Sequence, residues 1–195
     1  MQADCGCSNC ILKGKLEPSD KRYATFDYAI KLLNQKFAPI IVETGVARFG
    51  RRECRGDGCS TIIFAEWIRD HGGQFYSVDI DPRAIDNAKQ GLAELNPYVQ
   101  ITRQDSIEYL RNFNRKIDFL YLDSYDFDNN NPTPSQIHHL KEIHAAYPHL
   151  AQDCIVMIDD CDLPYGGKGK YVIEFLHMHG WKIIAQGYQV ILSRH

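Results

Sequence analysis

Acidic residues end or follow most of the short apolar runs in this sequence, and carboxylates in such positions can do chemistry. The set consists of Glu43, Asp79, Asp81, Asp105, Asp123 and the pair Asp159-Asp160. A carboxylate can accept hydrogen bonds from hydroxyl groups, hold a hard cation such as Mg²⁺ or transfer a proton. A lone Asp after a strand can instead serve only as a turn or capping residue. The function of the set therefore depends on whether the fold gathers its members at one place.

The elements that would position these acids alternate between strand and helix. Short runs rich in Ile, Val, Phe, Tyr and Leu predict strands in residues 40–42, 75–79, 99–103, 117–122 and 154–158. Helices are predicted in residues 19–35, 106–113 and 135–147, from Ser60 or Thr61 to Gly72, from Asp81-Pro82 onward, and up to about His179. Residues 181–186 and 188–193 are typical of an antiparallel hairpin around Gly187.

This alternation predicts an α/β fold with a doubly wound, mainly parallel sheet of about seven strands. Helices would cover both faces, and the C-terminal hairpin would be antiparallel. In such sheets ligands bind outside the carboxyl ends of the strands, where the strand order reverses. The acids would all lie at that edge, so we expect them to form one site. We expect residues 19–195 to form this single domain and residues 1–18 to form an irregular, Cys-rich arm.

Three segments resemble the cofactor half of class I S-adenosylmethionine (SAM)-dependent methyltransferases, which have a Rossmann-like fold. They are Val42-Glu43-Thr44-Gly45, Gly56-Asp57-Gly58-Cys59-Ser60-Thr61 and Tyr76-Ser77-Val78-Asp79-Ile80-Asp81-Pro82. The resemblance implies that Asp79 accepts hydrogen bonds from the ribose hydroxyls. Gly45, without a Cβ atom, would let the backbone pass close to the cofactor. The whole implied cofactor set is Glu43, Gly45, Gly58, Ser60, Thr61, Asp79, Asp105, Ser106 and Asp123. Here the first loop is longer than usual, with residues 48–55 as the extra segment.

Residues 117–124 and 155–160 are similar to small metal-dependent members of this class, such as the macrocin O-methyltransferase group and the cephalosporin-hydroxylase-like proteins. The resemblance implies that Asp123, Asp159 and Asp160 hold a divalent cation beside the methyl donor. Three hard carboxylate oxygens suit Mg²⁺. Such a cation could lower the pKa of a substrate hydroxyl. Alternatively, Asp160 only caps the segment that follows it.

The general base stays open at this point. Catechol-type enzymes carry a lysine three residues after the acid of strand four, and Asp126 stands at that position here. The candidates for catalytic roles are Asp123, Asp126, Tyr125, Lys168, His138 and His139. His138 and Glu142 share a helix face, so these histidines could also be surface or supporting residues rather than catalytic ones.

The seven cysteines allow a second metal site. Cys5, Cys7 and Cys10, with Cys54 or Cys59 as a fourth ligand, could bind a structural Zn²⁺. The spacing is not that of paired zinc knuckles, and a thiol-rich tail is the simpler interpretation. Because the count is odd and no secretory signal is apparent, we expect reduced thiols rather than a disulfide framework.

Composition limits the function classes. Hydrophobic residues make up 44% of the chain and charged residues 24%, which is typical of a globular protein, and the net charge is −3. The sequence lacks a global basic field and a run long enough for a membrane span, so we expect a cytoplasmic enzyme with neither nucleic acid nor membrane as partner. The hypothesis is SAM-dependent O-methylation of a small molecule with Mg²⁺; the oligomeric state, including a homo-oligomer, is left open.

Two rival hypotheses remain. One is a relative of the fold that binds the cofactor or a metal without catalysis. The other is a dinucleotide-dependent oxidoreductase, which predicts a compact Gly-x-Gly-x₂-Gly turn after the first strand. Gly45 and Gly50, with four residues between them, do not supply that turn.

Overall fold

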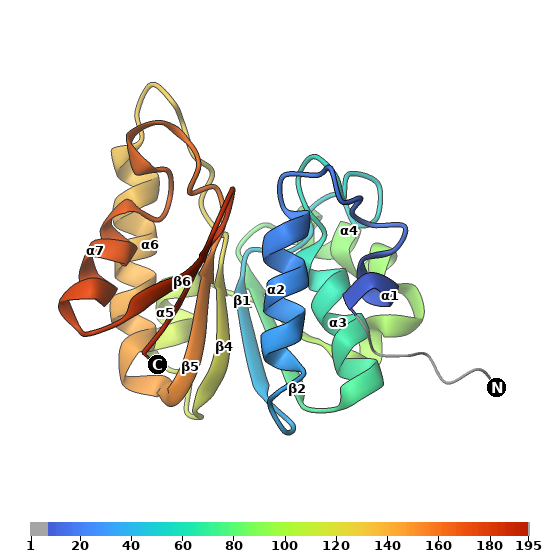
Figure 1. Ribbon diagram of the computed structural model, residues 1–195. Coiled ribbons are helices and arrows are strands. Elements are labelled where there is room, and N and C mark those ends of the chain that lie inside the picture. The colour runs from blue at the N-terminus through green and yellow to red at the C-terminus, as the bar shows by residue number, and fades with distance from the viewer. Residues whose placement is uncertain (1–7, 195) are drawn as a thin grey trace.

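The computed structural model describes residues 8–194, which form one sheet with helices on both faces (Figure 1). The strands are β1 (Ile40–Thr44), β2 (Gln74–Asp79), β3 (Gln100–Arg103), β4 (Ile117–Leu122), β5 (Leu150–Ile158), β6 (Lys182–Gln186) and β7 (Val190–Ser193). Their order is β3-β2-β1-β4-β5-β7-β6. The first five are parallel, whereas β7 is antiparallel to both β5 and β6. The predicted fold class is confirmed.

Two layers of helices enclose the sheet (Figure 1). One layer contains α1 (Ser8–Leu12), α2 (Tyr23–Leu33), α3 (Ser60–His71) and α4 (Pro82–Leu92). The other contains α5 (Ser106–Arg111), α6 (Thr133–Ala146) and α7 (Lys170–Met178). Short 3₁₀ turns, η1 (Ala93–Tyr98), η2 (Tyr147–His149) and η3 (Pro164–Gly166), join some of these elements. Among the described residues, no helix combines the length and apolar character needed to cross a membrane.

Each face of the sheet has its own apolar core. On the side of α2 and α3, the rings of Phe26, Phe64, Phe119 and Tyr121 pack with centroids 5.4–5.9 Å apart. On the opposite side, strand residues such as Leu120 pack with Trp181 and the α5–α7 layer. Both faces are covered, and this explains why the central strands are continuous apolar runs rather than alternating ones.

Helix α2 begins at Tyr23 rather than at Ser19, and this part of the chain differs most from the prediction. The Asp20 carboxylate accepts a hydrogen bond from the Glu17 amide at 2.7 Å and closes a turn before the helix. The expected irregular arm also contains α1, and Ile11 and Leu12 are buried in the core. Ile11 and Leu12 are not part of a long periodic pattern of apolar residues, so the sequence did not predict that α1 packs on the core.

The reversal of strand order lies at β1, between β2 and β4. Backbone hydrogen bonds continue beyond the strands and align the residues that follow them: Gly45 N to Val78 O at 2.8 Å, Asp123 N to Thr44 O at 3.0 Å, and Asp159 N to Leu122 O at 3.1 Å. The carboxyl ends of β2, β1, β4 and β5 therefore present one row of residues. This row is where the doubly wound fold predicts a ligand site.

Gly45 is required in this row by both conformation and space. Its φ is +82°, and a Cβ atom there would lie 2.4 Å from the carbonyl oxygen of Asp123. Gly180 has the same φ of +82° but open space around it. A comparison of substitutions at Gly45 and Gly180 therefore separates the free-energy cost of the backbone conformation from that of a steric clash.

We expect Gly45→Ala to lower the free energy of unfolding by more than Gly180→Ala does. Both changes place a side chain in the left-handed region, at about 1–2 kcal/mol, and Gly45→Ala adds overpacking of about 1–3 kcal/mol. Urea denaturation without cofactor measures both values. Equal losses in the two variants would contradict the predicted close approach of Gly45 to Asp123.

Candidate active site

A cavity opens at the reversal point of the sheet. It is lined by loops after β1, β2 and β4, and these loops contribute the predicted residues Gly45, Gly58, Ser60, Asp79, Asp123 and Asp126. Asp105 and Ser106 lie outside this lining: Asp105 caps α5 by accepting a hydrogen bond from the Glu108 amide at 2.9 Å. Asp105 and Ser106, both in the implied cofactor set, are therefore not part of the lining of this cavity.

Asp79 is held rigidly at the end of β2. Its Oδ2 accepts a hydrogen bond from the Val46 amide at 3.1 Å, and its Oδ1 accepts one from the Asp81 amide at 2.8 Å. The carboxylate thereby ties the loop after β1 to the loop after β2. A fixed carboxylate that faces a cavity is suited to binding hydroxyl groups.

Glu43 lies behind the cavity rather than in its lining. Its Oε2 accepts hydrogen bonds from Thr61 Oγ1 at 2.7 Å and Ser77 Oγ at 2.5 Å, and Thr61 Oγ1 accepts one from the Ala47 amide at 2.8 Å. The side chain is fully buried, and burial raises its pKa from the ordinary 4.5 to about 7. Glu43 and Thr61, both predicted to contact the cofactor, instead support the loop that does line the cavity.

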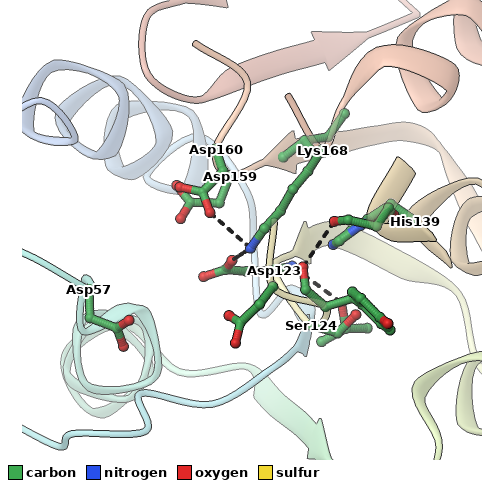
Figure 2. Close-up of polar contacts among 12 residues, drawn as sticks. Asp57, Asp123, Ser124, His139, Asp159, Asp160 and Lys168 are labelled. Carbon is green, nitrogen blue, oxygen red and sulfur yellow. Dashed lines mark hydrogen bonds and ion pairs between the residues drawn. The ribbon is translucent and has the colours of Figure 1, made fainter. Parts of the chain in front are cut away.

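The three predicted metal ligands do come together. Asp123, Asp159 and Asp160 each offer a carboxylate oxygen, and these oxygens lie within 4.8 Å of one another. We call these three residues the acid cluster. Figure 2 shows that Lys168 reaches into it, with Nζ 2.6 Å from Asp123 Oδ1 and 3.0 Å from Asp160 Oδ2.

A second cation, Arg22, which comes from the segment before α2, also binds the acid cluster. Its Nε lies 3.0 Å from Oδ1 of Asp159, its Nη2 lies 2.6 Å from Oδ2, and the same Nη2 lies 3.2 Å from Oδ1 of Asp160. Arg22 Nη1 also donates to the Gly56 carbonyl at 2.8 Å. Sequence reasoning missed Arg22, since nothing local distinguishes it and its partner lies 137 positions away.

The acid cluster as arranged does not fit a divalent cation, because an ammonium group already stands between Asp123 and Asp160. Burial alone would lower the pKa of Lys168, but the negative charges of Asp123, Asp160 and Asp159 outweigh it and hold that pKa above its ordinary value. Lys168 is therefore protonated, which disfavours the predicted role of general base. The Mg²⁺ prediction rested on the carboxylates alone and did not include their two cationic partners.

The predicted catalytic histidine, His139, is buried on α6. Its Nδ1 lies 2.8 Å from the Ser135 carbonyl, and burial lowers its pKa to about 4, so the ring is neutral near pH 7. Its neighbour His138 lies 3.1 Å from Ser106 Oγ. Glu142 accepts a hydrogen bond from Ser124 Oγ at 2.6 Å, next to Asp123 in the chain. These α6 residues support the loop after β4.

Arg48 closes one side of the cavity. Its guanidinium makes ion pairs with Asp57 at 2.9 Å and with Asp126 at 2.8 Å, so it joins the loop after β1 to the loop after β4. Asp126, the predicted base candidate, is 71% exposed and engaged in this pair. Arg48 belongs to the extra segment of the first loop. The unusual length of that loop was the one feature of the sequence that could have indicated a role for Arg48 at the cavity.

The cysteine predictions need correction. Cys54 and Cys59 are joined by a disulfide within the first loop, so neither is a free thiol that could complete a zinc site. Cys10 is exposed, and Cys5 and Cys7 lie outside the described residues. Close spacing in a single loop allowed this pairing, which the expectation of reduced thiols overlooked.

The raised pKa of Glu43 predicts that the stability of the fold depends on pH. In the folded state its pKa is about 7 instead of 4.5, so the folded protein holds this proton more tightly than the unfolded chain. Stability is therefore lost as pH rises from about 4.5 to about 7, by about 3 kcal/mol. Glu43→Gln removes the penalty, so the variant should gain stability over the wild type across this window. Denaturant unfolding at several pH values measures the difference, with Glu94→Gln at an exposed position as control; parallel curves for wild type and Glu43→Gln would contradict the prediction.

Solved structures share this fold at low sequence identity. NSun6 from Pyrococcus horikoshii, solved with SFG, superposes with a TM-score of 0.66 at 15% identity, over 84% of this chain and 50% of its own. The chain thus spans half the length of NSun6. The SAH-bound methyltransferase PaMTH1 from Podospora anserina gives 0.63 at 11% identity, over 92% of this chain and 80% of its own. An rRNA methylase from Streptococcus thermophilus gives 0.59 at 13%, over 91% and 98%.

Sequence comparison identifies the family. No curated protein matches the chain. Residues 55–161, more than half of the chain, match the family described as "Methyltransferase domain", and this range contains the carboxyl ends of β2, β4 and β5 with their acidic residues. The chain therefore belongs to the methyltransferase domain family.

Proposed function

We propose that this protein transfers a methyl group from SAM to an oxygen atom of a small molecule. The observation that carries the proposal is the cavity at the reversal point of a methyltransferase-family domain, with Asp79 fixed at its edge by two backbone amides. The SAH bound to PaMTH1, a protein of the same fold, supports the choice of cofactor.

The charges of the cavity lining support SAM as the cofactor. Asp79 would bind the ribose hydroxyls, and Gly45 leaves the backbone open beside it. The lining carries five carboxylates, those of Asp57, Asp79, Asp81, Asp123 and Asp126, against one cation, Arg48. An acidic lining complements the positive sulfonium and ammonium groups of the cofactor. SAM supplies an electrophilic methyl group at this place.

Asp123 is the residue best placed to handle the proton of an acceptor hydroxyl. It both lines the cavity and belongs to the acid cluster. Lys168 binds its Oδ1, which holds the carboxylate in one orientation and leaves Oδ2 to accept a hydrogen bond. An acceptor oxygen hydrogen-bonded there would be oriented for in-line attack and could pass its proton to the carboxylate.

The charge of the cavity favours a small acceptor over RNA. The rRNA methylase of Streptococcus thermophilus is matched over 98% of its length, so size alone does not distinguish the two classes. Nucleic-acid binding depends on basic side chains that contact phosphates. This lining is acidic and the whole chain has a net charge of −3, which is unfavourable for a polyanion.

We expect Asp79→Asn to weaken SAM binding roughly 10- to 100-fold, because hydrogen bonds to a charged group contribute about 1.5–3 kcal/mol. Isothermal titration of SAM into the purified protein measures the change. Asp86→Asn, an exposed change on α4 outside the cavity lining, is the matched control and should bind like the wild type. Equal affinity of both variants, or the absence of SAM binding by the wild type, would overturn the proposed function.

The acceptor class can be tested with SAM labelled in its methyl group. The protein is incubated separately with total RNA and with a mixture of small phenols, catechols and sugars. We expect label in the small-molecule fraction and its loss in Asp123→Asn, which cannot accept the proton in the same way. Label in RNA would overturn the small-molecule assignment, and tight SAM binding without transfer to either pool would favour a non-catalytic relative.

A further inference from the structure

The acid cluster contains a positive charge where a metal ion was predicted. We propose that Lys168, together with Arg22, replaces the divalent cation in this protein, so that the site functions without a bound metal. This inference rests on the proposed function only for its catalytic consequence, because the cation content of the acid cluster can be measured in the absence of SAM.

The Lys168 ammonium bridges two of the three carboxylates. Nζ lies 2.6 Å from Asp123 Oδ1 and 3.0 Å from Asp160 Oδ2, and the side chain is 2% exposed (Figure 2). Mg²⁺ requires oxygens at about 2.0–2.1 Å. An ammonium group and a metal ion cannot share the gap between these two oxygens. Metal binding would therefore require the lysine to leave a buried position.

The backbone around Lys168 makes that departure difficult. Gly167 lies against residue 160, where a Cβ atom would be 1.9 Å from the Asp160 carbonyl oxygen, and the Lys168 amide donates to that oxygen at 3.1 Å. Gln136 Nε2, from α6, donates to the Gly167 carbonyl at 3.1 Å. A Cβ atom at Gly169 would lie 2.5 Å from Cys161 Sγ. The loop that carries the lysine is thus packed directly on the segment that carries Asp160.

The third carboxylate is taken by Arg22. Asp159 is fully buried, and both of its oxygens lie within 3.1 Å of guanidinium nitrogens. The guanidinium is itself held by the Gly56 carbonyl and by the ring of Tyr188, whose centroid is 4.6 Å away. A metal ion would have to displace the Arg22 guanidinium from the oxygens of Asp159. The displaced guanidinium would then be a buried charge without a partner, which is strongly unfavourable.

Charge supports the replacement. The formal charges of the Lys168 ammonium and the Arg22 guanidinium add up to +2, the charge of one Mg²⁺, and together with three carboxylates they leave a formal charge of −1. Adding a divalent cation to the present arrangement would change this to +1. A cationic methyl donor beside the acid cluster would then be repelled instead of attracted.

The test is to remove the ammonium and measure cation binding directly. Mn²⁺ alone is titrated into the purified protein and followed by electron paramagnetic resonance, for wild type, Lys168→Met and Lys170→Met. Lys170 lies outside the acid cluster and serves as the matched control. We expect wild type and Lys170→Met to bind Mn²⁺ weakly, and Lys168→Met to gain one site that is tighter by about tenfold or more. Adding Asp123→Asn to Lys168→Met should abolish that site.

Either of two results of the Mn²⁺ titration would overturn the proposal: tight binding of one Mn²⁺ by the wild type that is lost in Asp123→Asn, or no gain of binding in a folded Lys168→Met. If Lys168→Met does not fold, the Mn²⁺ titration of the wild type still tests the proposal. The affinity of the wild type for SAM is then also measured in Mg²⁺ and in EDTA, and we expect the two affinities to be equal. A stronger affinity in Mg²⁺ would contradict the proposal. Failure of the wild type to bind SAM at all would overturn the proposed function and leave the Mn²⁺ result standing.

Discussion

The neutralisation of buried carboxylates at the carboxyl edge of the sheet is the constraint on which the rest of this structure depends. Removing charges from water costs several kcal/mol for each ion unless a partner is supplied. Here the partners come from distant segments: Arg22 precedes α2, and Lys168 follows η3. Because each must reach the same place, the entry to the first large helix and the loop after β5 are both positioned by electrostatics as well as by apolar packing.

The acids of this edge are chemically similar but have different environments, and their roles separate accordingly. Asp79 faces the cavity and is held by amides, so it is free to bind hydroxyl groups. Glu43 is buried among hydroxyls and serves as an internal support. Asp159 is fully paired with a guanidinium, whereas Asp123 is paired on one oxygen only. Position relative to the cavity, rather than residue type, therefore determines which carboxylate can meet a ligand.

Much of the fold was predictable because its signals are local. The apolar runs predicted the central strands. Asp81 followed by Pro82 predicted the start of α4, where the Asp81 side chain accepts a hydrogen bond from the Arg83 amide. The gathering of the acids followed from the geometry of parallel strands. The cationic partners were not predictable, since the Arg22–Asp159 pair joins residues 137 positions apart. The start of α2 was misplaced for a related reason, because a turn closed by Asp20 competes with the helix cap expected at Ser19.

The place of β7 has a consequence for the order of assembly. It is the last strand among the described residues, yet it lies between β5 and β6 in the sheet and pairs with Ile155–Ile158 along one edge of β5. During synthesis, β5 can pair with β4 as soon as it is made, but its other edge stays open until residues 190–193 are available. That edge is apolar and unpaired, which makes it a template for association with other chains. Nascent or truncated forms that lack β7 would therefore depend on rapid closure by the β6–β7 hairpin, or on a chaperone, to avoid association through this edge.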